Sequence, residues 1–159
     1  MPANADRNAP LLTDAEVLGK LPLLKQGVQE FNQGLFFQAH ETWEEIWIVS
    51  PWPVRNFLQG MIQVAAALVH LARNEYPGTH RLLREALRKL SAFPSPYLGV
   101  DNARLIEDCQ RCLEAVLALG EGGLGRFDRS LLPKIRLYAE EAGAIDVEGP
   151  PQEVAPPSN

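Results

Sequence analysis

Apolar residues recur every three or four positions over most of the chain, which is the spacing of amphipathic α-helices. No stretch shows the strict alternation of a half-buried strand. The pattern predicts a short helix over 15–20, capped by Thr13 or Asp14, and a weaker last helix over 131–140. Between them it predicts helices over 23–32, 35–49, 54–73, from Pro77 to near Phe93, and from the Asp101 cap to Leu119.

Prolines and glycines separate these helices. The breaks are Gly34, SPWP at 50–53, NEYPG at 74–78, PSP at 94–96 and GEGGLG at 120–125. Because the connections are short, consecutive helices should run antiparallel. The sequence therefore predicts an all-α, up-and-down bundle of five to six helices, with a central antiparallel hairpin 35–49/54–73.

The length of 159 residues and the hydrophobic content of 46% suit one globular domain. We expect this helical domain to span 13–139. Residues 1–12 are expected to be a flexible segment and 140–159 a disordered, proline-rich tail, because neither has the apolar spacing that would offset the entropy of ordering.

Two ionisable residues, His40 and Glu44, fall inside the apolar arc of the helix predicted over 35–49. They are four residues apart, so their side chains should be neighbours. A buried carboxylate must be paired, hydrogen-bonded or protonated, so both residues need partners. The other polar positions are expected at the edge of the arc (Glu41) or toward solvent (Gln38, Thr42 and Glu45).

The next helix, predicted over 54–73, is apolar over most of its circumference. Its narrow exception is the stripe Gln59, Gln63, Ala66 and His70. With equal rise in both helices, Glu44 should lie opposite Gln59 and His40 opposite Gln63. We therefore expect a polar cluster of His40, Glu44, Gln59 and Gln63 in or beside the core, with His70 one or two turns away.

These two helices resemble a known family. FNQGLFFQAHETWEEIW and FLQGMIQVAAALVHLARN are similar to the phrases FNxGxYFEAHExxExxW and FLxGLIQxAxAxYH of the small helical family catalogued as domain of unknown function 309. The resemblance covers roughly 25–119 and implies a compact helical bundle whose activity is not established. Gln38 replaces the usual glutamate, which weakens any mechanism that needs a carboxylate there. The matching positions are Phe31, Asn32, Gly34, His40, Glu41, Glu44, Trp47, Gly60, Gln63 and His70.

The sequence HETWE also suggests chemistry. It resembles the zincin pattern H-E-x-x-H, so His40 and Glu44 could hold a divalent metal if a third ligand came from elsewhere. The other histidines are His70 and His80. Di-iron chemistry is disfavoured, because no E-x-x-H pair is present. A Glu44 oriented by His40 could also act in general acid–base catalysis. A satisfied core network is the commoner role of such a pair.

Three further features have ordinary interpretations. Cys109 and Cys112 form C-x-x-C within a helix, where they continue an apolar seam with Leu105, Val116 and Leu119 and favour core packing. Arg81, Arg84 and Arg88, with Arg73 and Lys89 nearby, form a basic stripe that could contact phosphates or simply face solvent. Trp52 could anchor a partner or cover the end of the bundle.

The net charge of −5 disfavours a nucleic-acid partner, and no signal sequence or membrane span is visible, so we expect a cytoplasmic protein. The leading hypothesis is a binding or interaction protein, possibly a homo-oligomer, with a structural His–Glu–Gln cluster. The alternative is a metal-dependent or acid–base enzyme, hydrolase-like, that uses His40, Glu41 and Glu44. A sealed cluster favours the first; converging ligand atoms with solvent access favour the second.

Overall fold

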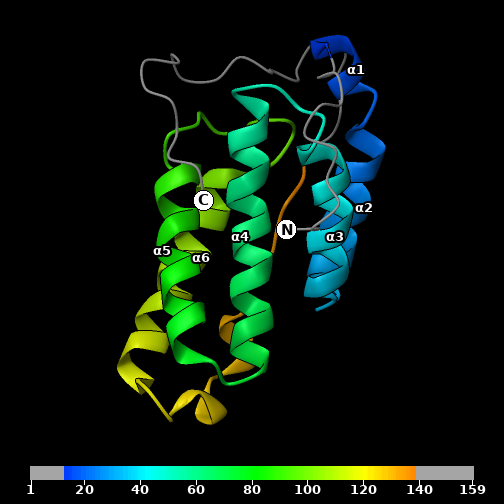
Figure 1. The fold of residues 1–159 in the computed structure, drawn as a ribbon. Helices are drawn as coiled ribbons and strands as arrows, with labels where there is room; N and C mark the ends of the chain where they lie inside the picture. Colours follow the sequence, from blue (N-terminus) through cyan, green and yellow to red (C-terminus); the bar gives the residue numbers. More distant parts are fainter. Residues whose placement is uncertain (1–12, 139–159) are drawn as a thin grey trace.

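Residues 13–138 are described by the structure, a computed structural model, and they form six α-helices with no strand beyond isolated bridges (Figure 1). This confirms the all-α prediction. The helices are α1 (Asp14–Leu18), α2 (Leu21–Asn32), α3 (Phe36–Trp47), α4 (Val54–Ala72), α5 (Tyr76–Leu90) and α6 (Asn102–Leu119), followed by the 3₁₀ turns η1 (Leu124–Arg126) and η2 (Arg129–Leu131). The tail segments predicted at 1–12 and 140–159 lie outside the described residues.

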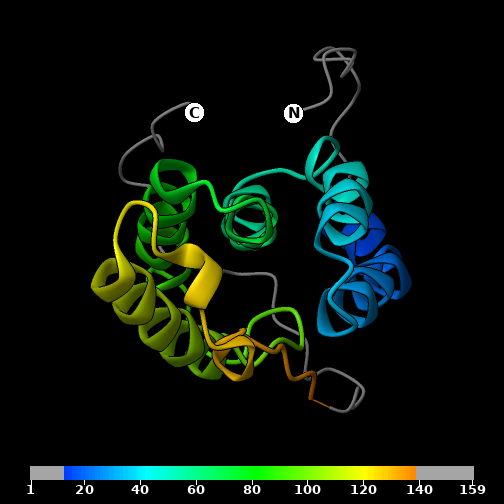
Figure 2. The ribbon, with the colours of Figure 1, turned by 90° about the horizontal axis from the view of Figure 1, so that it is seen from below.

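Helix α4 occupies the middle of the bundle. It packs against α3 on one side and α5 on the other, while α2 covers α3 and α6 covers α5. The end-on view shows α4 between these two helix pairs (Figure 2). Its position explains why α4 is apolar around most of its circumference, since both neighbours need an apolar face. None of the described helices is long and apolar enough to cross a bilayer.

Side-chain caps define two of the helix starts. The Thr13 side chain accepts a hydrogen bond from the Glu16 backbone, and the Glu16 carboxylate bonds back to Thr13, which completes a capping box at α1. Asp101 accepts from the Arg104 backbone at the start of α6. Both predicted caps are therefore present, with Thr13 rather than Asp14 at α1.

The prediction of a helix over 131–140 is wrong within the described residues, because no helix follows Leu131 there. After η2 the chain is extended up to residue 138. Pro133 has no N–H to donate and disfavours helix in the residue before it. The Asn32 carboxamide replaces the missing helical bonds at Ile135: its Nδ2 donates to the Ile135 carbonyl, and its Oδ1 accepts from the Ile135 N–H, both at 2.8 Å.

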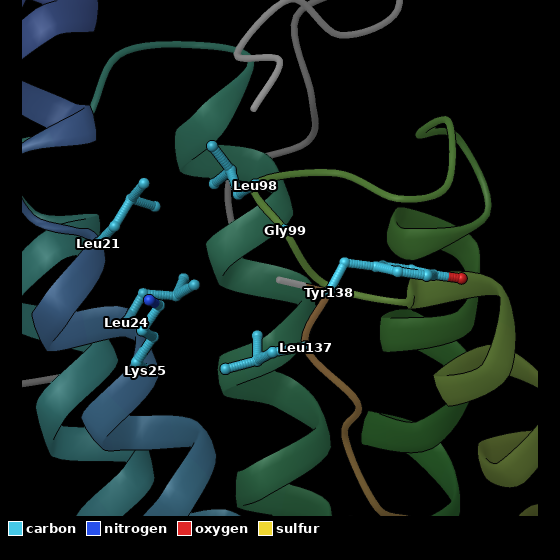
Figure 3. Close-up of a pocket in the computed structure, with 7 residues that line it drawn as sticks. All are labelled: Leu21, Leu24, Lys25, Leu98, Gly99, Leu137 and Tyr138. Atoms are coloured by element: carbon cyan, nitrogen blue, oxygen red, sulfur yellow. The ribbon is translucent and has the colours of Figure 1, made fainter. Parts of the chain in front are cut away.

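A small pocket lies between α2 and this extended segment (Figure 3). Leu21, Leu24 and Lys25 of α2 face Leu137 and the turn at 98–99 across the gap, whereas the Tyr138 ring points away from it. Its lining is mostly aliphatic and brings no group of ligating side chains together.

Candidate functional site

The rotation of α3 is fixed by its contact with α2. The Trp43 indole Nε1 donates to the Leu24 carbonyl at 3.1 Å, and the ring lies so close to Gly27 that a Cβ there would be 2.1 Å from Nε1. Thr42, which was expected to face solvent, is buried instead, and its hydroxyl donates to Glu30 Oε1 at 2.6 Å. The apolar arc of α3 did not predict this burial, because α3 has a second neighbour, α2, on the face that carries Thr42.

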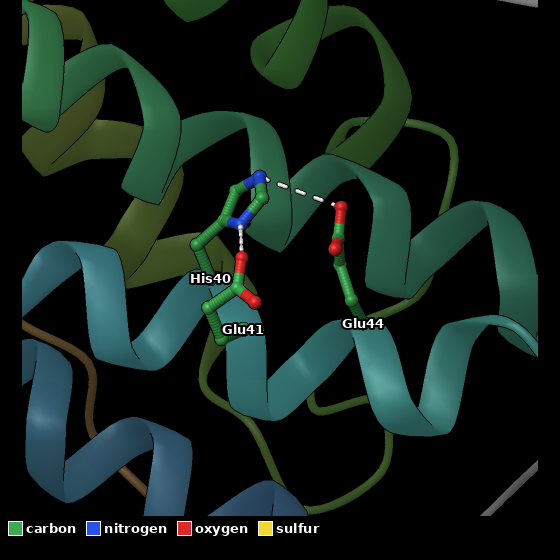
Figure 4. Close-up of side chains that lie close together, drawn as sticks. All are labelled: His40, Glu41 and Glu44. Atoms are coloured by element: carbon green, nitrogen blue, oxygen red, sulfur yellow. Dashed lines mark hydrogen bonds and ion pairs between the residues drawn. The ribbon is translucent and has the colours of Figure 1, made fainter. Parts of the chain in front are cut away.

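Trp43 is held against α2. His40 and Glu44 lie on another flank of α3, and their side chains point toward α4 (Figure 4). His40 lies between two carboxylates. Its Nδ1 is 3.3 Å from Glu41 Oε1, and its Nε2 is 3.5 Å from Glu44 Oε1. The ligating atoms of the three residues all lie within 4.8 Å of one another. No other group of three such side chains is as close within residues 13–138.

Exposure changes steeply across this group. The Glu44 side chain is 3% exposed, His40 is 17% exposed and Glu41 is 53% exposed. The group therefore connects a buried carboxylate to solvent through one imidazole ring. Glu44 is therefore sealed, His40 is partly exposed and Glu41 faces solvent, so the group is neither wholly sealed nor wholly open.

Phe37 closes one face of the imidazole. Its ring is nearly parallel to that of His40, at an interplanar angle of 9° and a centroid distance of 6.3 Å, and its side chain is 57% exposed. Sequence reasoning counted Phe37 only as part of the apolar arc. The i, i+3 spacing of Phe37 and His40 could have indicated the contact.

The amides expected opposite this group lie on α4. Gln63 is buried, and no donor among the described residues bonds its Oε1. Gln59 is half-buried. Their pairing with His40 and Glu44 stays a prediction.

His70 lies in the last turn of α4, next to the connection to α5. Its Nδ1 is 3.1 Å from Glu75 Oε1, and its ring fills the space where Gly78 lacks a side chain, since a Cβ there would be 2.8 Å from the ring. It is not part of the ligating group around His40. His80 contacts the Tyr76 ring at a centroid distance of 4.8 Å.

The group of His40, Glu41 and Glu44 lies within a segment that matches a known family. Residues 24–82 match the family described as a domain of unknown function (DUF309). The match runs from α2 into α5 and confirms the resemblance seen in the two motifs. An uncharacterized protein of Bacillus subtilis (strain 168), YpuF, is 36% identical over 84 residues, which is 51% of this chain and 48% of the relative. The chain thus spans about half of that relative's length, and neither name states an activity.

Within the DUF309 match, His40, Glu41 and Glu44 are brought together, whereas Trp52 is half-buried in the α3–α4 connection. The motif residue Asn32 has a structural role that sequence reasoning missed. It holds the extended segment at Ile135, more than 100 positions along the chain, and no local pattern predicts such a contact.

The two cysteines lie outside the DUF309 match, on α6. Both are free and fully buried, as the seam pattern predicted. Burial raises the pKa of the Cys112 thiol to about 12 and that of Cys109 well above its ordinary value. Neither thiol supplies a thiolate at neutral pH, which rules against the redox interpretation of C-x-x-C.

Lys89 is not part of the exposed basic stripe on α5. Arg81, Arg84 and Arg88 are exposed, but the Lys89 side chain is completely buried, with Nζ 3.4 Å from Glu85 Oε2. Removal from water lowers the pKa of Lys89 more than the Glu85 charge raises it. Lys89 is on the inward face of α5, so it cannot contribute to a phosphate-binding surface.

Proposed function

We propose that this protein binds a divalent metal ion through His40, Glu41 and Glu44. The observation that supports the proposal is the convergence of one imidazole and two carboxylates within 4.8 Å. These are the residue types that hold zinc, manganese and iron in proteins.

The distance between Glu44 and His40 adds to this support. Glu44 Oε1 is 3.5 Å from His40 Nε2, which is close enough for both atoms to bind one ion. Three side chains leave coordination positions for water or a substrate, as in catalytic rather than structural metal sites. A metal-bound water in such a position can serve as a nucleophile near neutral pH. The proposed activity is therefore metal-dependent and of hydrolytic type.

The test is elemental analysis of full-length protein purified without a histidine tag, combined with melting curves in added Zn²⁺ or Mn²⁺. We expect near-stoichiometric metal, and a stabilisation of about 2.7 kcal/mol when free metal exceeds the dissociation constant about 100-fold. His40→Ala and Glu44→Gln should abolish the shift. Glu45→Gln, which changes an exposed carboxylate on the same helix, is the matched control and should keep it.

Two results together would contradict the proposal: protein that contains no metal, and a melting temperature that no added metal changes. In that case the cluster would act only in fixing how α3 packs on α4. Such a role is known for some polar groups in cores.

A second candidate function is self-association through α3. Leu35 and Phe37 are 42% and 57% exposed, which is high for large apolar side chains that are two positions apart. Light scattering should show a dimer whose dissociation constant rises at least 10-fold in the Phe37→Ser variant. A monomer at all concentrations would exclude it.

A cytoplasmic location without a nucleic-acid partner is also proposed. The net charge of −5 supports it. Arg81, Arg84 and Arg88 are the exposed cations to test, and no band shift with DNA or RNA is expected even at low salt, where such contacts are strongest.

A further inference from the structure

We infer that α3 of one copy packs on α5 of a second copy, with an acidic stripe of α3 against the basic stripe of α5. The acidic stripe consists of Phe37, Glu41 and Glu45, and the basic stripe consists of Arg81, Arg84 and Arg88. This inference rests on the second candidate function, self-association through α3, and names the surface that α3 meets. The proposed metal site keeps all three of its ligands.

The exposed face of α3 is acidic, with an aromatic ring at one end. The sequence of the helix, FFQAHETWEEIW, contains three glutamates and no lysine or arginine. Phe37, Glu41 and Glu45 recur at intervals of four positions, so they follow one side of the helix, and all three are exposed. The acidic stripe therefore presents the Phe37 ring and the Glu45 carboxylate about 12 Å apart along the helix.

The exposed face of α5 has the opposite charge. Four of its fifteen residues are Lys or Arg, and Glu85 is its one acidic residue. The basic stripe has the spacing i, i+3 and i+7 on one side of the helix and spans about 10 Å, close to the length of the acidic stripe. Arg88 is paired with Glu85 at 2.8 Å, but no carboxylate within residues 13–138 forms an ion pair with Arg81 or Arg84.

The two stripes do not neutralise each other within one copy. Helix α4 lies between α3 and α5 (Figure 2). In the part of the chain that the structure describes, no ion pair joins a residue of the acidic stripe to a residue of the basic stripe. A second copy can therefore supply the charge that each stripe lacks.

The signs of the charges decide which surfaces pair. A twofold axis through α3 would bring the acidic stripe against its own counterpart, and a twofold axis through α5 would do the same with the basic stripe. Both arrangements place like charges together, which is unfavourable. Packing of α3 on α5 places unlike charges together, and this contact is heterologous, or head-to-tail.

The chemistry of the two stripes fits at both ends. A guanidinium group forms a charge-assisted, bidentate pair with a carboxylate such as that of Glu45, and it also packs on an exposed aromatic ring such as that of Phe37. This chain makes the second kind of contact elsewhere. Arg55 Cζ lies 4.2 Å from the centre of the Trp47 ring, and Arg136 Cζ lies 5.3 Å from the centre of the Tyr138 ring.

Arg84 lies in the middle of the basic stripe, so it is level with Glu41 whichever way the two helices run. A head-to-tail dimer leaves one acidic and one basic stripe unoccupied at its ends. Larger species should therefore follow the dimer as the protein concentration rises.

Analytical ultracentrifugation of full-length protein over a range of concentrations, with a chelator present, tests the contact. Arg84→Glu and Glu45→Arg should each raise the dissociation constant at least roughly 10-fold, because like charges then meet. Raising NaCl from about 0.1 M to about 1 M, which shortens the screening length from about 10 Å to about 3 Å, should also weaken association. Arg126→Glu, which reverses an exposed cation outside both stripes, is the matched control and should leave the dissociation constant unchanged.

Rescue of Glu45→Arg identifies the direction of packing. A second substitution in the same chain, Arg81→Glu, should restore association if the helices run antiparallel, because Glu45 is then level with Arg81. Arg88→Glu should restore it if they run parallel. Rescue by neither substitution would overturn the inference.

Association that is lost in Phe37→Ser but unchanged in Arg84→Glu would show that α3 meets a surface other than α5. That result would overturn the inference and leave self-association through α3 standing. Protein that stays monomeric at all concentrations would refute both. Neither result bears on metal binding, because the chelator removes metal from these measurements. Circular dichroism checks that each variant keeps the helical fold.

Discussion

At the scale of single residues, the indole of Trp43 leaves no room for a side chain at Gly27, because a Cβ there would be 2.1 Å from Nε1. We predict that Gly27→Ala lowers the free energy of unfolding by about 2 kcal/mol, because the new methyl group must displace the indole and break its bond to Leu24. The gain in helix propensity from glycine to alanine, about 1 kcal/mol, is smaller than this cost. Urea denaturation measures the change.

Gly125→Ala is the control for this prediction, since nothing lies within 4 Å of the position that its Cβ would take. It should alter stability by less than about 0.5 kcal/mol. Equal effects of the two substitutions would mean that Trp43 is not seated against Gly27.

The sequence was a good guide to neighbours within one helix. The i, i+4 spacing of His40 and Glu44 sufficed to predict that they lie side by side, because helix geometry alone brings them together. Thr42 and Lys89 were misplaced, because their burial depends on which face of a second helix they meet. The periodicity of one helix does not show which neighbouring helix a given residue meets.

At the scale of elements, the two thiols of α6 give a pH-dependent stability. Their pKa values are raised in the folded protein by burial, to about 12 for Cys112, so the folded state keeps protons that the unfolded state releases above pH 9. We predict that the free energy of unfolding falls as pH rises from 9 toward 12, by up to roughly 1.4 kcal/mol per pH unit for each thiol. Below pH 9 the thiols contribute no slope.

Denaturation at a series of alkaline pH values measures this slope. The Cys109→Ala/Cys112→Ala double variant should be less stable overall but flatter with pH, because other groups titrate equally in both proteins. Thiol reagents should also leave the native protein unmodified at pH 8. Rapid labelling there would contradict the burial of α6.

Element boundaries were predictable where proline, glycine or a capping side chain defines them, as at Thr13 and Asp101. The helix predicted over 131–140 was not found in the described residues for a different reason. The extended conformation there is stabilised by Asn32, a residue from the other end of the fold, which competes successfully with a weak local helical pattern.

At the scale of the whole molecule, Asn32 connects the start of the DUF309 match to the last described segment. We predict that Asn32→Ala lowers the free energy of unfolding by about 1–3 kcal/mol, because two hydrogen bonds to the Ile135 backbone are lost. It should also speed tryptic cleavage after Lys134 and Arg136, which limited proteolysis measures.

Asn32→Asp provides the matched comparison. Its carboxylate can accept from the Ile135 N–H but cannot donate to the Ile135 carbonyl, so its effect should fall between those of wild type and Asn32→Ala. Cleavage that is equally slow in all three proteins would show that other contacts hold the segment.

The helical class, the hairpin and the candidate ligands were predictable from periodicity and motif. The central place of α4 and the pairing of Asn32 with Ile135 were not, because they depend on how separate helices assemble. The exposure of Glu41 could not be predicted either, because it also depends on how the helices assemble.

Helix α3 carries its anchor and its ionisable group on different flanks: Trp43 is seated on α2, while His40 and Glu44 rise in front of α4. A substitution at Phe37 or Glu41 therefore changes the surroundings of the imidazole and leaves the contacts of the Trp43 indole with Leu24 and Gly27 in place.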